Sequence, residues 1–146
     1  MVTERSFGTL PSGEEVKCFH LENASGAYAE VLSFGAVITK ICVPDRQGNL
    51  IDVVLGYDTL EGYMKTDAFR RMHRTQRKPD RRRTFKLDGQ EVILAQNEGK
   101  TNNLPQRIRM VLKKKLWTAK HIDQENNSVT FSRISPDGEN GFPGEI

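Results

Sequence analysis

The sequence predicts an all-β protein, a partial antiparallel β-sandwich that is incomplete at the C-terminus. Short runs rich in Val, Ile, Phe and Leu are separated by Gly, Asn, Asp and Pro turn signals. Residues 27–34 (AYAEVLSF) alternate with the period of a strand, and helical periodicity is nearly absent. Repeated short strands joined by turns are typical of two sheets that each bury one face.

The first part of the chain predicts a series of strands. In residues 27–34, Tyr28, Glu30, Leu32 and Phe34 share one face and alternate with smaller residues. The next run has apolar residues on both faces, which predicts a strand covered on both sides. The four expected strands are 15–23, 27–34, 36–43 and 51–56, with turns at ASG (24–26) and PDRQGN (44–49).

Two hairpins are expected further along. Residues 84–97 form one around Asp88-Gly89, a dipeptide that tolerates the positive φ angles of tight turns. Residues 116–123 and 127–135 form the other, turned at Gln124 to Asn126. The final SPDGENGFPGEI has the composition of a loop leading into a further strand, so we expect the sheet to be interrupted there.

Charge is concentrated in one segment. The chain has 22 Lys+Arg and 19 Asp+Glu, but residues 70–83 (RRMHRTQRKPDRRR) hold eight of the cations and one of the anions. The remaining residues are therefore net acidic, and the run lacks the interleaved aromatic residues that stack on bases. A second basic stretch, residues 104–115 (LPQRIRMVLKKK), is also foreign to its surroundings. We expect solvated loops rather than a nucleic-acid interface, which stays the weaker alternative.

Other site chemistry is sparse. Cys18 and Cys42 are too few for a disulfide scaffold and too far apart for a CxxC pair, which predicts reduced, half-buried thiols. His20, His73 and His121 are too scattered for a metal site and are expected to be structural or solvated. No P-loop, GxGxxG or GxSxG motif occurs, and no run approaches the roughly 18 apolar residues of a membrane span. We expect one domain over 1–146, in the cytoplasm, with no cofactor, metal, nucleic acid or membrane partner.

Several stretches, in order, resemble the N-terminal part of the aldose 1-epimerase (galactose mutarotase) family. Their order and spacing carry the resemblance, since any one alone would be weak. They are FGTLPSGEEV near the start, LSFGAVITKICVPDRQGNLIDVVLGYDTLEGY (32–63), TFKLDGQEVILAQNEG (84–99), KKLWTAK (114–120) and FSRISPDGENGFPGE (131–145). The resemblance implies a large antiparallel β-sandwich about twice this length, so that 1–146 is the N-terminal part of a single galactose mutarotase-like domain.

The departures from the family pattern fall in the two basic stretches. The Asn-Arg pair by which the family holds the sugar falls at Lys78 and Pro79, and the sugar-facing His of an LHGG-like motif falls at Pro105. One codon choice for residues 69–82 encodes FGACIGRNANRIAG, the family pattern, once a single C is removed after the Phe69 codon. We therefore hypothesise that both stretches are out-of-frame translations inside an otherwise intact gene.

The resemblance implies interconversion of the α and β anomers of aldoses such as galactose and glucose. In the family a Glu base and a His acid of an NHxYFNL-like motif lie in the C-terminal half, and neither motif occurs here. We expect no catalytic, substrate-binding or metal-binding residue in this chain and a truncated, inactive fragment. An aldohexose would bind only in a completed fold, exposed sheet edges favour self-association, and a noncatalytic carbohydrate-binding β-sandwich is the alternative.

Overall fold

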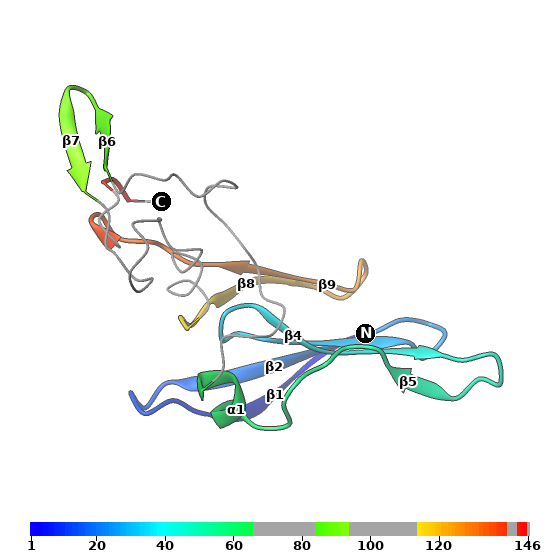
Figure 1. Ribbon diagram of the computed structural model, residues 1–146. Coiled ribbons are helices and arrows are strands. Elements are labelled where there is room, and N and C mark those ends of the chain that lie inside the picture. Colours follow the sequence, from blue (N-terminus) through cyan, green and yellow to red (C-terminus); the bar gives the residue numbers. More distant parts are fainter. Residues whose placement is uncertain (66–83, 94–113, 140–142, 146) are drawn as a thin grey trace. The chain divides into compact units, whose positions relative to one another are not determined.

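The computed structural model describes residues 1–65, 84–93, 114–139 and 143–145 (Figure 1). The described part is built almost entirely of antiparallel strands, as predicted. The elements in order are β1 Val2–Thr9, β2 Glu15–Glu22, β3 Tyr28–Leu32, β4 Val37–Pro44, β5 Leu50–Asp52, α1 Leu60–Lys65, β6 Thr84–Leu87, β7 Gln90–Ile93, β8 Thr118–Asp123 and β9 Ser128–Ser132. One compact unit comprises Met1–Met72 and Lys113–Ser132, and a second comprises His73–Leu112 and Arg133–Ile146.

The first unit contains a five-stranded meander in the order β1-β2-β3-β4-β5, with every neighbouring pair antiparallel (Figure 1). Strands joined by short turns pair most simply with the next strand in sequence. The register pairs Cys18 with Leu32 and Leu32 with Val37, which brings apolar side chains from three strands onto one face.

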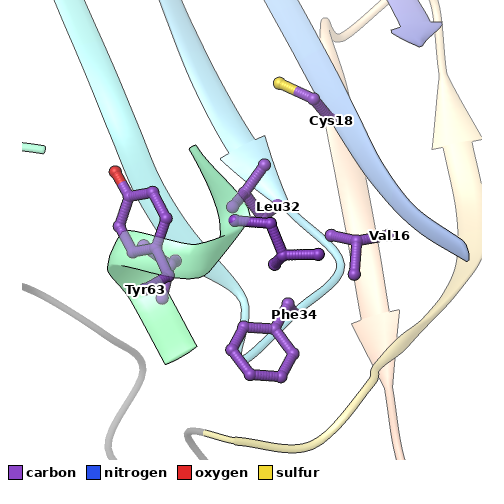
Figure 2. Close-up of a cluster of buried hydrophobic side chains, with 7 residues drawn as sticks. Val16, Cys18, Leu32, Phe34 and Tyr63 are labelled. Atoms are coloured by element: carbon purple, nitrogen blue, oxygen red, sulfur yellow. The ribbon is translucent and has the colours of Figure 1, made fainter. Parts of the chain in front are cut away.

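This apolar face forms the core together with α1. In Figure 2, Tyr63 of the helix gathers in one cluster with Leu32 and Val16 of the sheet and with Phe34, which follows β3. Tyr63, Leu32 and Val16 have no measurable exposure, and each fully buried side chain of this kind contributes about 1.5–3 kcal/mol. The buried cluster comprises Val16, Cys18, Leu32, Phe34, Val37, Leu60 and Tyr63.

The opposite face of the sheet is contacted by the hairpin of β8 and β9. The rings of Phe19 and Phe131 meet edge to face with centroids 5.3 Å apart. Gln124 at the hairpin turn accepts a hydrogen bond from the Val2 amide at 2.8 Å and donates one to the Val2 carbonyl at 2.7 Å. These contacts form the second layer of the predicted sandwich, so the all-β sandwich prediction is confirmed.

The structure differs from the sequence prediction at four elements. Strand β1 and helix α1 were not expected, and β5 is shorter than the predicted strand 51–56. The expected cover on both faces of residues 36–43 is wrong, because Ile38 and Val43 are 37% and 39% exposed. Both hairpins are confirmed within the described residues, and residues 94–97 of the first lie outside them. Asp88 and Gly89 take the expected positive φ values of 49° and 81°.

Candidate functional site

The positions at which the family would hold its sugar are not visible in this structure. Lys78, Pro79 and Pro105 lie outside the described residues, as do Phe69 and His73. The prediction that none of them grips a sugar, and the out-of-frame hypothesis, therefore stay predictions.

A group of polar side chains on β1, β2 and β3 lies close together, and we call it the His20 cluster. It comprises Arg5, His20, Glu22, Tyr28 and Glu30. The antiparallel register pairs His20 with Glu30 and Glu22 with Tyr28 across β2 and β3. Since alternate residues of a strand share a face, these polar side chains continue the row begun by the buried Cys18 and Leu32.

The side chains of the His20 cluster lie within close polar and ring contact of one another. The His20 imidazole lies 3.3 Å from a Glu22 carboxylate oxygen and 3.6 Å from a Glu30 oxygen. Its ring centroid is 4.5 Å from that of Tyr28. The Arg5 guanidinium donates to Glu30 at 3.1 Å. The Glu30 carboxylate is therefore shared between a guanidinium and an imidazole.

Exposure differs sharply across the His20 cluster. The Glu30 side chain is 11% exposed, whereas the Arg5 side chain is 51% exposed. A nearly buried carboxylate requires a compensating partner, because desolvating an unpaired charge is costly. The Arg5 guanidinium provides that compensation at 3.1 Å, so this pair stabilises the sheet face.

The two cysteines beside this cluster are free and buried, more deeply than the half-buried state expected. Burial, assisted by the Glu30 charge, raises the pKa of Cys18 to about 11. A hydrogen bond with Cys42, followed by burial, raises the pKa of Tyr28 to about 12. At neutral pH the Cys18 thiol and the Tyr28 hydroxyl are protonated, so neither is poised as a nucleophile or base.

The remaining described histidine, His121, lies on β8 with an exposed side chain. It is not part of the His20 cluster. Among the residues that the structure describes, no three His, Cys, Asp or Glu are placed together as metal ligands.

In the second unit, the loop after β9 is held by an ion pair. Arg133 binds Glu139 through two nitrogens at 2.9 and 2.6 Å, and the Ser135 hydroxyl donates to the same carboxylate. Both charged side chains are nearly buried, at 13% and 11% exposure. The Glu139 amide donates to the Pro136 carbonyl, and Gly138 has a φ of 76°. This geometry is that of a turn, in keeping with the expected role of the SPDGENGFPG stretch, of which residues 140–142 lie outside the described part.

One feature of the sequence points to the His20 cluster. The alternation in residues 27–34 placed Glu30 on the same face as Leu32 and Phe34, where an unpaired carboxylate is unfavourable. A carboxylate at that position requires a nearby cation, but the pairing with Arg5 depends on cross-strand register.

Within the described residues, no helix has the length and apolar character of a membrane span.

The relatives found among curated proteins and solved structures all belong to one family. The chain is 42% identical to the galactose mutarotases of Bos taurus and Homo sapiens over 147 aligned positions, which is 99% of this chain and 41% of each relative. It is 28% identical to the aldose 1-epimerase of Escherichia coli K12, over 93% of this chain and 38% of the relative. The chain thus spans about two-fifths of the length of the curated relatives it matches.

The fold comparison agrees with the sequence comparison. The structure of a galactose 1-epimerase from Lactobacillus acidophilus superposes with a TM-score of 0.75 at 20% identity, covering 99% of this chain and 42% of that one. A C. elegans homologue of aldose epimerase superposes with a TM-score of 0.68 at 26% identity, covering 86% and 38%. The family model for aldose 1-epimerase matches residues 17–146. This chain therefore belongs to the aldose 1-epimerase family.

Proposed function

We propose that residues 1–146 form the N-terminal part of a single galactose mutarotase-like domain, and that the complete domain interconverts the α and β anomers of aldoses such as galactose and glucose. The observation that carries this proposal is the 42% identity to bovine galactose mutarotase across 99% of the chain. The antiparallel sandwich and its likeness to a galactose 1-epimerase structure support it.

Anomer exchange requires two groups on opposite sides of a held sugar. A base removes the proton from the anomeric hydroxyl, and an acid protonates the ring oxygen so that C1 can open, rotate and reclose. No redox change occurs, so the reaction needs no redox cofactor. An aldohexose bound in the completed fold is the proposed substrate.

We further propose that no residue of these 146 acts as the catalytic acid, the catalytic base or a sugar ligand. His20 is engaged by two carboxylates and a tyrosine ring. The family positions that would hold the sugar carry Lys78, Pro79 and Pro105, and proline offers no side-chain donor or acceptor. Taken as a polypeptide on its own, the 146-residue chain is expected to be inactive.

The proposed compartment is the cytoplasm. Cys18 and Cys42 are free thiols, which is the state kept by a reducing environment. A secreted domain of this size more often uses its cysteines in disulfides.

A pair of chimeras tests the proposal. In the first, this chain replaces the matching N-terminal 41% of bovine galactose mutarotase. In the second, residues 69–83 and 104–113 of that chimera are exchanged for the aligned bovine residues. Mutarotation of fresh α-D-galactose is followed by polarimetry, and circular dichroism checks folding.

We expect the first chimera to be inactive and the second to be active, because only the second regains the sugar-holding segments. A folded second chimera without activity would contradict the proposal that this chain builds the N-terminal part of the domain. Activity in the first chimera would contradict the assignment of no sugar ligand to the two basic stretches.

A further inference from the structure

The sequence contains two Asp-Gly pairs, and the structure holds them differently. Asp88-Gly89 forms the two-residue turn between β6 and β7, at the tip of that hairpin (Figure 1). Asp137-Gly138 lies in the loop after β9. A glycine has no side chain to keep its backbone nitrogen from approaching the carboxyl group of the preceding aspartate. An Asp-Gly pair is therefore a place where a side chain and the main chain react readily with each other.

The reacting groups of the first pair are accessible. Both Asp88 and Gly89 are exposed. Among the residues that the structure describes, none makes a hydrogen bond or an ion pair with the Asp88 carboxylate. A β-carbon built at Gly89 would meet no atom within 4 Å, so the space beside the turn is open. The Asp88 carboxyl group is consequently free to move toward the following nitrogen.

The hairpin that carries this turn is small. Strands β6 and β7 form a two-stranded sheet, and no third strand in the described part pairs with it. A two-stranded hairpin is only marginally stable, so its tip opens more often than the interior of a larger sheet. Asp88 also has a φ of 49°, a left-handed conformation that is unfavourable for a residue with a β-carbon. Local opening relieves that strain and brings the carboxyl group within reach of the Gly89 nitrogen.

The carboxylate of the second pair is engaged. Asp137 accepts a hydrogen bond from the Gly144 amide. The loop around it is fixed by the nearly buried ion pair of Arg133 and Glu139. The Asp137 carboxyl group must leave the Gly144 amide before the Gly138 nitrogen can attack it. Breaking a hydrogen bond to a charged group first slows the attack about tenfold or more.

We propose that Asp88-Gly89 is a site of spontaneous covalent modification, at which Asp88 converts to isoaspartate through a cyclic succinimide. The Gly89 nitrogen attacks the Asp88 carboxyl carbon Cγ, an N–Cγ bond forms, and the carboxyl OH leaves with the amide proton as water. Water then adds to one of the two ring carbonyl carbons and breaks its bond to nitrogen. Addition at the α-carbonyl leaves the chain linked through Cγ as isoaspartate, and addition at Cγ restores aspartate. One water leaves and one enters, so the conversion needs no oxidant, reductant or enzyme.

Isoaspartate changes the length of the turn. The main chain then runs through Cβ and Cγ of residue 88, which adds one atom to the two-residue turn. Leu87 and Gln90, the closing pair of the hairpin, lie directly beside it, and turn length sets the register of a hairpin. We expect the isoaspartate form to lose the pairing of β6 with β7.

Peptide mapping of the aged chain tests the proposal. The purified chain is incubated at neutral pH and physiological temperature and cleaved with trypsin, and electron-transfer fragmentation locates each isoaspartate. Asp88 and Asp137 fall in separate tryptic peptides, 87–100 and 134–146. In the reference sample the chain is cleaved first and the peptides are then incubated, which removes the fold and keeps both Asp-Gly pairs. We expect the ratio of isoaspartate at 88 to isoaspartate at 137 to be about tenfold or more higher in the folded chain than in the reference.

Two matched substitutions provide a second readout. Asp88→Asn keeps a residue that suits the turn, because Asn-Gly is also a favoured pair in two-residue hairpin turns. An asparagine amide reacts without first being protonated and loses ammonia, so the conversion is faster and is visible as a mass change. Asp137→Asn makes the same change at the other pair, with a side-chain oxygen that is still able to accept from the Gly144 amide. We expect Asp88→Asn to deamidate severalfold faster than Asp137→Asn.

Three results would overturn the proposal. Equal isoaspartate ratios in the folded chain and the reference would mean that the fold does not distinguish the two pairs. An Asp88 that stays unconverted in the folded chain while its reference peptide reacts would mean that the hairpin protects it. Equal deamidation of Asp88→Asn and Asp137→Asn would contradict the protection assigned to Gly144. For the structural consequence, β6 and β7 amides that exchange hydrogen equally slowly in the isoaspartate form and the unmodified chain would overturn the expected loss of pairing.

Discussion

Replacing Gly56 with alanine is expected to destabilise the first unit by about 2 kcal/mol, within the usual cost of overpacking. A β-carbon at this position would lie 2.6 Å from the Thr39 carbonyl oxygen and 2.7 Å from the Tyr63 hydroxyl. Contacts this short require movement of one partner. The Thr39 carbonyl oxygen is part of the β4 backbone, so it cannot rotate away as a side-chain atom could.

The same substitution threatens a hydrogen bond in the core. The Tyr63 hydroxyl accepts a hydrogen bond from the Tyr57 amide at 2.8 Å, and Tyr63 itself is fully buried. Displacing the phenol weakens that bond, and Tyr63→Phe alone, which removes the oxygen, is expected to cost about 1 kcal/mol. Combining Gly56→Ala with Tyr63→Phe relieves one of the two close contacts. The double variant is therefore expected to cost less than the sum of the single variants.

Urea unfolding of the wild type, both single variants and the double variant measures these free energies as a double-mutant cycle. Circular dichroism and tryptophan fluorescence should give coincident transitions if unfolding is two-state. A Gly56→Ala variant within about 0.5 kcal/mol of wild type would refute the reasoning, because it would mean that the Thr39 carbonyl and the tyrosine can yield freely. Strict additivity in the cycle would refute the part assigned to the tyrosine hydroxyl.

Three further outcomes follow from the structure. Phe19→Ala is expected to cost about 3–5 kcal/mol in urea unfolding, because Phe19 is 1% exposed and packs edge to face on Phe131; a cost under about 1 kcal/mol would contradict that packing. The Cys18 thiol, whose pKa burial raises to about 11, is expected to react slowly with a chromogenic disulfide in the native state and quickly after unfolding; a fast native reaction that Cys18→Ser abolishes would count against this. Hydrogen bonds from Asn126 lower the pKa of Asp123 below its ordinary 3.8, so this carboxylate contributes stability above that value, and the contribution is lost as the pH falls through the folded-state pKa. Asp123→Asn is therefore expected to lose less stability than wild type between neutral pH and about pH 3, and equal losses in the two proteins would contradict this.

Local turn chemistry explains why the hairpins were predictable from sequence. Asp88-Gly89 has the residue types that a tight turn demands, and the structure shows both residues at positive φ. Strand β1 was missed because its sequence, VTERSFGT, has too few apolar residues to show alternation. It is nevertheless a strand, since its backbone pairs with β2 along nearly its whole length.

Helix α1 was missed for a different reason. At six residues it is shorter than two turns, so no helical period can be recognised in it. Only the tertiary structure shows that Leu60 and Tyr63, three positions apart, both face the sheet core. The need for glycine at position 62 also depends on the tertiary structure, because a β-carbon there would lie 2.5 Å from the Tyr57 ring.

The candidate site also combines a feature that local sequence predicts with contacts that depend on tertiary structure. Strand alternation indicated that Glu30 shares the buried face with Leu32, but its partners Arg5 and His20 come from neighbouring strands. Their proximity depends on a cross-strand register that local sequence does not determine. The expected sugar-holding positions lie in the two basic stretches, so that part of the prediction rests on the sequence and its family resemblance.

Polarimetry of the 146-residue chain with freshly dissolved α-D-galactose and α-D-glucose tests the central claim most directly. Bovine galactose mutarotase serves as the active comparison. The chain is purified from a host that lacks its own mutarotase, so that no contaminating activity is present. We predict that optical rotation relaxes at the rate of buffer alone at every concentration of the chain. A relaxation rate that rises in proportion to the concentration of the chain would contradict the claim that these residues supply neither the proton donor and acceptor nor the sugar ligands.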